Sequence, residues 1–346
     1  MKRKYLALCV TNALIVSSLS FNTLEVRAED NIEPSIYDKL LKVNGHVGLI
    51  TEWKETVYYD ASGNKTGKST YTENSIFDTS LSFQEYPLDV FYAFKQATDD
   101  YQSKNGADNQ KEEGLKHLLL LSTDHYLGNG FNVGASLNNE WYFADRVYSG
   151  PWVNGEYSKK EHLMEANLFT DYWNSRLGFG AYTYASYKMN NLVNDQQKGQ
   201  EWGDYNIDGW AISTKPTKNF DSINIGVELY YGKDKTKSNN TGSYLQDFDE
   251  WFVEPSFSFT GDYGTFSIRH RYAQQTTTQN FGHDKYFTTV NKTTVGYNFS
   301  YDSWRLGGEV EFNKNENEAD TSWSGGRVDN GHDELTRFMV YGQYAF

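Results

Sequence analysis

Apolar and polar residues alternate along most of the chain that follows residue 42. In the first such stretch Val43, Val47 and Trp53 are apolar, whereas Glu52 and Lys54 are polar. A period of two residues is typical of a β-strand with one apolar side, because successive side chains point to opposite faces. The alternation returns in 14 segments, with a tolerance of about 12 to 16 because short strands are easily merged or split.

The connections between these segments alternate in length along the chain. Short turns such as 128–130 and 301–303 are rich in glycine, asparagine, aspartate and serine, and they predict tight hairpins. The long, polar connections span residues 60–68, 99–113, 149–160, 194–204, 234–243, 280–284 and 313–331. Short turns on one side and long loops on the other are the pattern of bacterial outer-membrane barrels. The sequence therefore predicts an all-β fold, a transmembrane antiparallel up-and-down β-barrel of 14 strands over residues 42–346.

Two of the predicted strands alternate poorly. Leu118 to Leu121 form a continuous apolar run in the strand 115–126, and the strand 205–214 has no clear period. The faces of these two strands are therefore not assigned.

Composition favours the membrane barrel over a soluble fold. The hydrophobic content of 38% and the mean hydropathy of −0.72 are low, yet aromatic residues reach 16%, and disordered chains are poor in aromatics. A barrel wall needs only one apolar side on each strand. A soluble β-sandwich or propeller would also alternate, but its connections need not sort by length. Aromatic residues near turns, such as Tyr301 and Trp304, suit the boundary between lipid and water.

The first 28 residues have the features of a secretory signal peptide. A basic start is followed by an apolar stretch and by small residues ending at Ala28. A membrane-spanning helix is the alternative, but Asn12 and several serines interrupt the stretch. Residues 29–41 are expected to be a periplasmic lead-in. The only cysteine, Cys9, lies in the signal segment, and the net charge of −14 argues against nucleic acid as a partner.

The predicted water-facing side of the strands carries charges of both signs. The candidate pore-lining residues are Glu52, Lys54, Asp78, Lys95, Glu140, Glu165, Asp171, Glu228, Glu250, Glu254, Arg269, Arg271, Arg305, Glu309, Glu311 and Arg337. Rings of charge set the ion preference of a pore, so the excess of acids predicts mild cation selectivity. The four arginines belong to neighbouring strands, and they either oppose acids across the lumen or pair locally with Glu309 and Glu311.

The same pattern gives no support to catalysis or to a bound metal. Carboxylates two residues apart arise wherever one side of a strand faces water, and neither a Gly-x-Ser-x-Gly elbow nor closely spaced His and Cys residues occur. We therefore expect no catalytic residue, no metal ligand and no cofactor.

The C-terminus carries a family resemblance. Residues 338–346 place Phe338, Val340, Tyr344 and Phe346 at alternate positions and end on an aromatic residue. This ending resembles the signal by which the barrel-assembly machinery recognises outer-membrane barrels. With its 14 predicted strands, the whole chain resembles the OmpG-type monomeric outer-membrane porins.

The resemblance implies a function and a set of partners. It implies a wide, monomeric channel for ions, sugars and short oligosaccharides in the outer membrane of a Gram-negative bacterium. Its partners would be outer-membrane lipids, the barrel-assembly machinery and small hydrophilic solutes. Some such porins close at acid pH through paired lumen histidines, but His46 is predicted to face the lumen and His270 to face outward, so the pair is not matched.

Three other functions remain open. Arginines and the tyrosines Tyr182, Tyr184 and Tyr230 could form a track for specific oligosaccharides. An outer-membrane protease or lipase would usually have fewer strands and a filled interior. An adhesin would act through its loops, which here stay below about 20 residues and are short for a binding domain.

Overall fold

The structure, a computed structural model, describes most of the chain after residue 42. The described residues are 43–83, 87–106, 108–150, 154–194, 204–279, 283–321 and 324–346. The predicted signal peptide 1–28 and the predicted lead-in 29–41 lie outside them.

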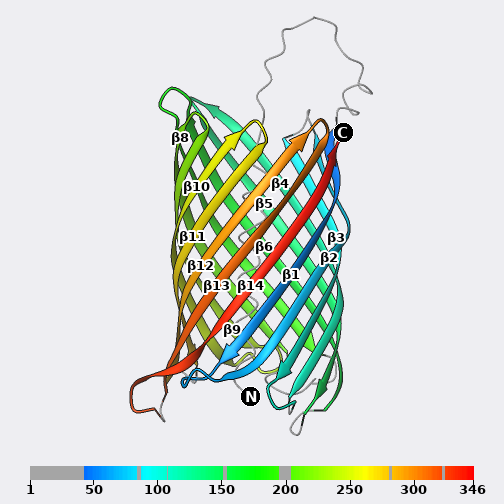
Figure 1. Cartoon of the computed structure of the whole chain (residues 1–346), viewed down its shortest axis with the longest axis vertical. Helices are drawn as coiled ribbons and strands as arrows, with labels where there is room; N and C mark the ends of the chain where they lie inside the picture. Colours follow the sequence, from blue (N-terminus) through cyan, green and yellow to red (C-terminus); the bar gives the residue numbers. More distant parts are fainter. Residues whose placement is uncertain are drawn as a thin grey trace, which may run out of the picture. The chain divides into compact units, whose positions relative to one another are not determined.

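The described residues form a closed barrel of 14 antiparallel strands (Figure 1). The strands are β1 (Val43–Tyr59), β2 (Lys65–Phe83), β3 (Leu88–Ser103), β4 (Asn109–Gly128), β5 (Phe131–Ser149), β6 (Gly155–Asn174), β7 (Phe179–Asn194), β8 (Tyr205–Phe220), β9 (Ile223–Ser238), β10 (Tyr244–Gly261), β11 (Gly264–Gln279), β12 (Asp284–Tyr301), β13 (Trp304–Asp320) and β14 (Arg327–Ala345). This confirms the predicted fold class and strand number. The described part of the chain contains no helix with the length and apolarity needed to cross a membrane.

The barrel is closed by pairing between the first and last strands. Lys54 on β1 lies opposite Arg337 on β14, and the register continues to His46 opposite Ala345. The backbone N–H of Gly45 donates to the carbonyl oxygen of Phe346 at 3.1 Å, and the N–H of Phe346 donates back at 2.9 Å. A closed sheet has no edge strand with unpaired backbone groups, which is what a lipid environment requires.

The long connections are shorter than the sequence predicts. Of the predicted loop 99–113, only residues 104–108 lie outside strands, and of 313–331 only 321–326. The predicted boundaries are wrong because both faces of these segments are polar, which removes the alternation without preventing backbone pairing. Strands of up to 20 residues, as in β4, result, whereas about 9 to 11 residues suffice to cross a bilayer.

The connections at the other end of the barrel are tight, as predicted. Residues 129–130, 221–222, 262–263 and 302–303 each join two strands as two-residue turns. Asn129, Asp221 and Asp302 all have φ of 53° there. Two-residue hairpins favour such left-handed residues because the resulting turn matches the twist of the strands.

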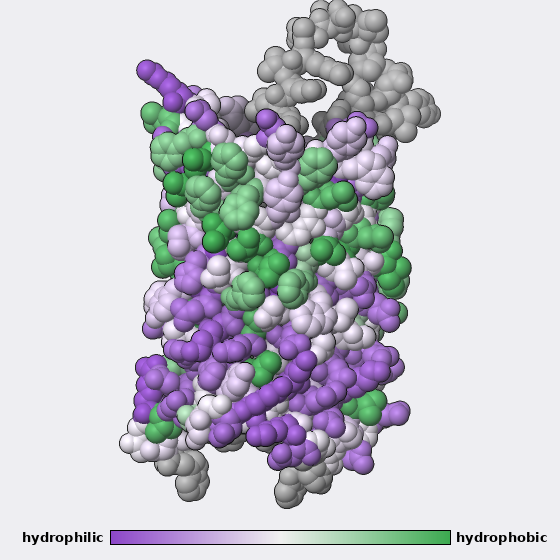
Figure 2. All heavy atoms as spheres, in the orientation of Figure 1, coloured by the Kyte–Doolittle hydropathy of each residue, from purple (hydrophilic) through white to green (hydrophobic). Residues whose placement is uncertain are grey.

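An apolar band covers the outside of the barrel on the half nearest the short turns. Figure 2 shows hydrophobic residues in the upper part and mainly hydrophilic residues in the lower part. Outward-facing apolar residues with large exposed fractions include Leu49, Leu168, Ile212, Ile225, Leu229, Ile268, Tyr297, Leu306, Phe338 and Val340. Because exposed apolar surface of this extent is unfavourable in water, the band is the part of the wall that suits lipid.

The strands continue beyond the band with polar residues outside. On β13 the outward positions change from Phe312 to Lys314 and Glu316, which form an ion pair at 3.0 Å. On β9 they change from Tyr231 to Lys233. We call this polar part of the strands the collar. Near its border the rings of Trp251 on β10 and Tyr272 on β11 lie 5.7 Å apart, where amphipathic rings suit a membrane interface.

The structure also assigns the faces of the two strands that alternate poorly. On β4, Leu118 and Leu120 point inward and are 2% and 5% exposed, so the inner side of this strand is partly apolar. On β8 the inward residues Ala211 and Ser213 are small, and Trp210 points outward. Apolar or small inward residues weaken the contrast on which a sequence-based assignment depends.

Candidate functional site: the inner wall of the barrel

Contacts between strands that are not neighbours identify the inner side of the wall. Lys116 on β4 reaches Glu73 on β2 at 2.7 Å. Arg269 on β11 likewise reaches Glu309 on β13 at 3.0 Å. Side chains can reach across an intervening strand only on the concave side of a barrel. Strand pairing then extends this assignment to every strand, since directly opposite residues share a face.

The pairing places all the charged residues that the sequence assigns to the pore on the inner wall. They are Glu52 and Lys54 on β1, Asp78 on β2, Lys95 on β3, Glu140 on β5, Glu165 and Asp171 on β6, Glu228 on β9, Glu250 and Glu254 on β10, Arg269 and Arg271 on β11, Arg305, Glu309 and Glu311 on β13, and Arg337 on β14. That solutes pass along them stays a prediction.

A register shift on β2 brings Asp78 inward. The pairing slips between Ser75 and Phe77, so that Ile76 and Phe77 both point outward, with exposed fractions of 50% and 44%. Asp78 is fully buried and lies 3.9 Å from His46 on β1. His270, by contrast, lies on the outer face, where its Nδ1 is 2.9 Å from the hydroxyl of Thr293.

Ion pairs connect the inner wall from β5 to β1. Lys116 contacts Glu140 at 3.6 Å and Glu73 at 2.7 Å. Lys95 contacts the other oxygen of Glu73 at 2.7 Å. The hydroxyl of Tyr71 also donates to Glu73, and the ammonium of Lys54 lies 4.8 Å from the centre of the Tyr71 ring.

The same chain of contacts continues from β1 to β13. Glu52 contacts Lys54 and accepts hydrogen bonds from Nε and Nη2 of Arg337, at 2.9 and 2.7 Å. Arg337 lies 3.5 Å from Glu311 and 3.9 Å from Glu309. Arg337 therefore joins carboxylates of both neighbouring strands, including the strand that closes the barrel.

Strands β10 to β12 complete this group. Arg271 donates to Glu254 through Nε at 2.6 Å, and Arg269 lies 3.9 Å from the same carboxylate. Lys292 lies 3.8 Å from Glu311. Arg269, Arg271 and Arg337 thus pair with carboxylates on neighbouring strands. Of the two alternatives that the sequence leaves open, local pairing is the one observed for these three arginines. No ion pair of Arg305 occurs among the described residues.

We call these residues the ionic belt. Its members are Glu52, Lys54, Glu73, Lys95, Lys116, Glu140, Glu254, Arg269, Arg271, Lys292, Glu309, Glu311 and Arg337. Six carboxylates face seven cations. The belt is therefore close to neutral, although the whole chain carries a formal charge of −14.

The sequence missed several inner-wall charges. Glu73, Lys116 and Lys292 belong to the belt but sit in segments whose polar or apolar neighbours hide the alternation. Nearer the long connections, Glu112 contacts Arg146 on β5 and lies 3.5 Å from Lys159 on β6. A run of polar residues on both faces, next to a strand that alternates, is the sequence signal that could have indicated strands there.

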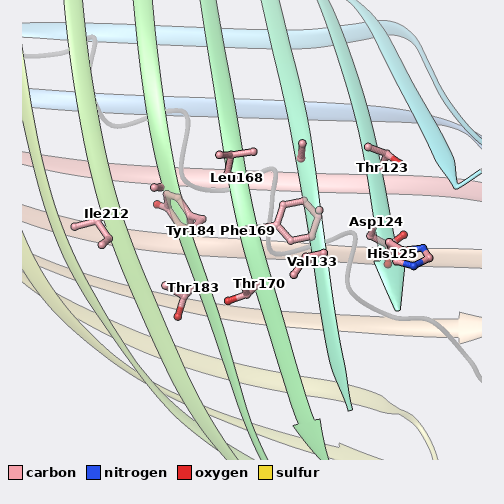
Figure 3. Close-up of a pocket in the computed structure, with 13 residues that line it drawn as sticks. Thr123, Asp124, His125, Val133, Leu168, Phe169, Thr170, Thr183, Tyr184 and Ile212 are labelled. Atoms are coloured by element: carbon pink, nitrogen blue, oxygen red, sulfur yellow. The ribbon is translucent and has the colours of Figure 1, made fainter. Parts of the chain in front are cut away.

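The remaining arc of the inner wall, from β6 to β9, is rich in aromatic side chains. Tyr182 lies between Phe169 and Tyr184, with ring centres 5.7 and 6.0 Å apart. Figure 3 shows Phe169 on β6 and Tyr184 on the neighbouring strand β7; the two are paired directly. The hollow drawn there, about 580 Å³, is lined mainly by outward residues, among them Val133, Leu168 and Ile212.

The described residues contain no group of three or more His, Cys, Asp or Glu side chains arranged to hold a metal ion. Most ionic side chains of the inner wall contact one another, and the wall provides a charged and aromatic surface around the lumen.

Comparisons with solved structures find other barrels. The TodX monoaromatic hydrocarbon channel (deltaS2 mutant) superposes with a TM-score of 0.52 at 10% identity, covering 88% of this chain and 90% of that chain. The toluene transporter TbuX of Ralstonia pickettii gives a TM-score of 0.49 at 9% identity, with 89% and 91% covered. Identities this low show a shared fold and carry no information on the solute. No curated protein sequence matches the chain.

A family profile covers nearly the whole sequence. The profile described as CymA, putative cyclodextrin porin, matches residues 1–334. A match of this extent includes every strand from β1 to β13 and the first eight of the 19 residues of β14. The chain therefore belongs to the family of the putative cyclodextrin porin CymA.

Proposed function

We propose that this protein is a passive channel in the outer membrane of a Gram-negative bacterium, through which sugars, short oligosaccharides and small ions diffuse. The observation that carries the proposal is the inner wall. Its charged side chains are largely paired with one another in the ionic belt, so the wall is hydrophilic without presenting a dense net charge to a neutral solute. The family description favours carbohydrate over other small hydrophilic solutes.

The outer surface supports the membrane location. The apolar band lies outside and the charged side chains lie inside, which is the arrangement a lipid-embedded barrel needs. Barrels of about eight strands are filled by side chains, whereas those of 16 to 18 strands enclose an aqueous channel. Fourteen strands stand closer to the second group.

The proposal includes the partners and the monomeric state. The band would contact outer-membrane lipids. The barrel-assembly machinery would recognise the last strand, where Phe338, Val340, Tyr344 and Phe346 are 46%, 60%, 40% and 56% exposed. The ladder closes within one chain, which supports a monomer. The closer resemblance to OmpG-type porins remains a prediction.

We also retain mild cation selectivity as part of the proposal. With the belt balanced, the preference would come from inner-wall acids outside it. Asp171, Glu228 and Glu250 have no ion-pair partner among the described residues. Rings or clusters of uncompensated carboxylates favour cations in a pore.

Two measurements test the channel. Purified protein in a planar bilayer should give discrete conductance steps, and proteoliposomes should swell in sugars of increasing size, up to maltoheptaose and α-cyclodextrin. A general pore sorts these sugars by size alone, whereas a selective channel admits an oligosaccharide faster than a smaller unrelated solute. Protein that inserts but conducts no ions would contradict the proposal. The comparisons give no support to the alternative of an outer-membrane hydrolase.

A further inference from the structure

Five aromatic side chains of the inner wall lie on the arc from β6 to β9, beside the ionic belt. They are Phe169 and Trp173 on β6, Tyr182 and Tyr184 on β7, and Tyr230 on β9. We call these five residues the aromatic arc. Belt residues occupy β1 to β5 and β10 to β14, so the arc lies between the two ends of the belt. The strands of the arc also carry the ion pair of Lys188 on β7 with Asp234 on β9, at 2.5 Å.

Glycines allow the rings to lie along the wall. A β-carbon at Gly134 on β5 would overlap the Phe169 ring, and one at Gly180 on β7 would overlap the Trp173 ring. On β9 a β-carbon at Gly232 would overlap the phenol of Tyr230. An aromatic ring laid over a neighbouring glycine covers the backbone there. Such a ring turns one face to the sheet and the other to the lumen.

The rings of the arc stay partly open. Phe169, Tyr182, Tyr184 and Tyr230 are all half-buried. The arc ends at Phe252 on β10, which is 3% exposed because it lies between other groups. Tyr230 stacks on it with ring centres 4.6 Å apart, and the guanidinium of Arg271 lies 3.7 Å from its centre. The row of partly open rings on the arc therefore ends at β10.

Hydrogen-bond acceptors accompany the rings. Glu228 on β9 accepts a hydrogen bond from the hydroxyl of Ser213 at 2.9 Å. Asp171 on β6 lies directly opposite Tyr182. Neither carboxylate has an ion-pair partner among the described residues. An ionised carboxylate has several acceptor positions, so both can accept hydrogen bonds from a ligand that carries hydroxyl groups.

We propose that the aromatic arc is a weak binding surface for the pyranose rings of oligosaccharides on their way through the barrel. A pyranose has an apolar C–H face, which suits an open aromatic face, and hydroxyl groups at its rim, which suit the carboxylates. The inference rests on the proposed channel function and names the part of the wall that retains the solute. Binding in a channel must be strong enough to favour entry and weak enough to allow exit.

The test compares ring loss with hydroxyl loss at the same positions. The double variant Tyr182→Leu/Tyr184→Leu keeps apolar volume without aromatic faces. The matched variant Tyr182→Phe/Tyr184→Phe keeps the faces and loses the hydroxyls. Tyr341→Leu on β14 is the positional control, because Tyr341 also lies over a glycine, Gly307, but outside the arc. Tyr184→Leu alone serves if the double variant does not insert.

Each protein is placed in a planar bilayer, and its current is recorded in salt with added maltohexaose or α-cyclodextrin. We expect both sugars to interrupt the wild-type current in a concentration-dependent way. The two leucine substitutions should weaken this block about tenfold, and the single one about threefold, if each ring contributes the energy typical of an aromatic contact. The phenylalanine variant and Tyr341→Leu should stay within about twofold of the wild type.

The salt-only recordings separate the two proposals. A protein that gives no conductance in salt would contradict the channel function itself. A wild-type channel that conducts normally but is blocked by neither sugar would overturn the aromatic arc alone. Equal weakening of block in Tyr341→Leu and in the leucine variants of the arc would also overturn it, because the effect would then be general to the wall.

Discussion

Arg337 is the side chain whose replacement should affect the ionic belt most. Its guanidinium is 5% exposed and donates two hydrogen bonds to Glu52, which is 9% exposed. It also lies within 4 Å of Glu311 and Glu309. The substitution Arg337→Gln removes the only cation that contacts β1 and β13 together among the described ion pairs.

The expected loss follows from the enclosure of these groups. Removing one partner of a buried ion pair costs about 3 to 5 kcal/mol, because the other charge stays behind without compensation. Lys54 still contacts Glu52, and Lys292 still lies near Glu311. We therefore expect about 3 kcal/mol, at the lower end of that range. Arg337→Lys keeps the charge and loses one of the two hydrogen bonds, which should cost about 1 kcal/mol.

The measurement is unfolding by guanidinium chloride in detergent micelles, followed by tryptophan fluorescence and analysed by linear extrapolation. The double variant Arg337→Gln/Glu52→Gln completes a double-mutant cycle. We expect its loss of unfolding free energy to be smaller, by at least about 1 kcal/mol, than the sum of the losses of the two single variants. If Arg337→Gln unfolds within about 0.5 kcal/mol of the wild type, the belt contributes no more than exposed ion pairs do, and the reasoning from burial fails.

Three further substitutions, on the outer and inner faces of the barrel wall, have predictable effects. Val340→Arg, in the apolar band, should lower folding stability in lipid vesicles by about 2 to 4 kcal/mol, whereas Glu334→Arg, at an exposed position of the collar, should change it by less than about 1 kcal/mol. Gly134→Leu should destabilise the barrel by about 1 to 3 kcal/mol in the same unfolding assay, since the new side chain overlaps Phe169; stability equal to that of the wild type would mean that the ring does not lie over this glycine. Glu228→Gln should move the reversal potential in a salt gradient toward zero, and an unchanged potential would show that this carboxylate has no part in ion preference.

Much of the fold could be predicted because a barrel wall imposes two regularities on the sequence. Side chains alternate between lipid and water, and connections alternate between the two ends. Both regularities survive in strands such as β9 and β13, where Leu229 and Val310 point outward. The collar could not be predicted, because water lies on both sides of the wall there and no alternation is required. The sequence therefore predicts loops, such as 313–331, where the structure has strands of the collar.

The sequence predicts which face of the wall a side chain points to more readily than it predicts which other side chain it contacts. The inward position of Arg337 follows from its alternation with Phe338 and Val340, which lie on the opposite, apolar side of β14. Its contact with Glu52, 285 positions earlier in the chain, depends on how the barrel closes and in which register. Leu118 illustrates the opposite limit: it is apolar and yet inward, so a rule that assigns apolar residues to lipid fails there.

The division of the inner wall into a belt and an arc is consistent with a neutral, hydroxyl-rich solute. Charges that already contact each other, as Lys116 and Glu73 do at 2.7 Å, have less to gain from a passing ion than unpaired charges would. Aromatic faces such as that of Tyr184 interact with apolar C–H groups whatever the ionic strength. The carboxylates of Asp171 and Glu228 lie beside these rings and can accept hydrogen bonds from the hydroxyl groups of the same solute. On the proposed function, the lumen would stay open to salt along the belt and would retain oligosaccharides weakly on the arc.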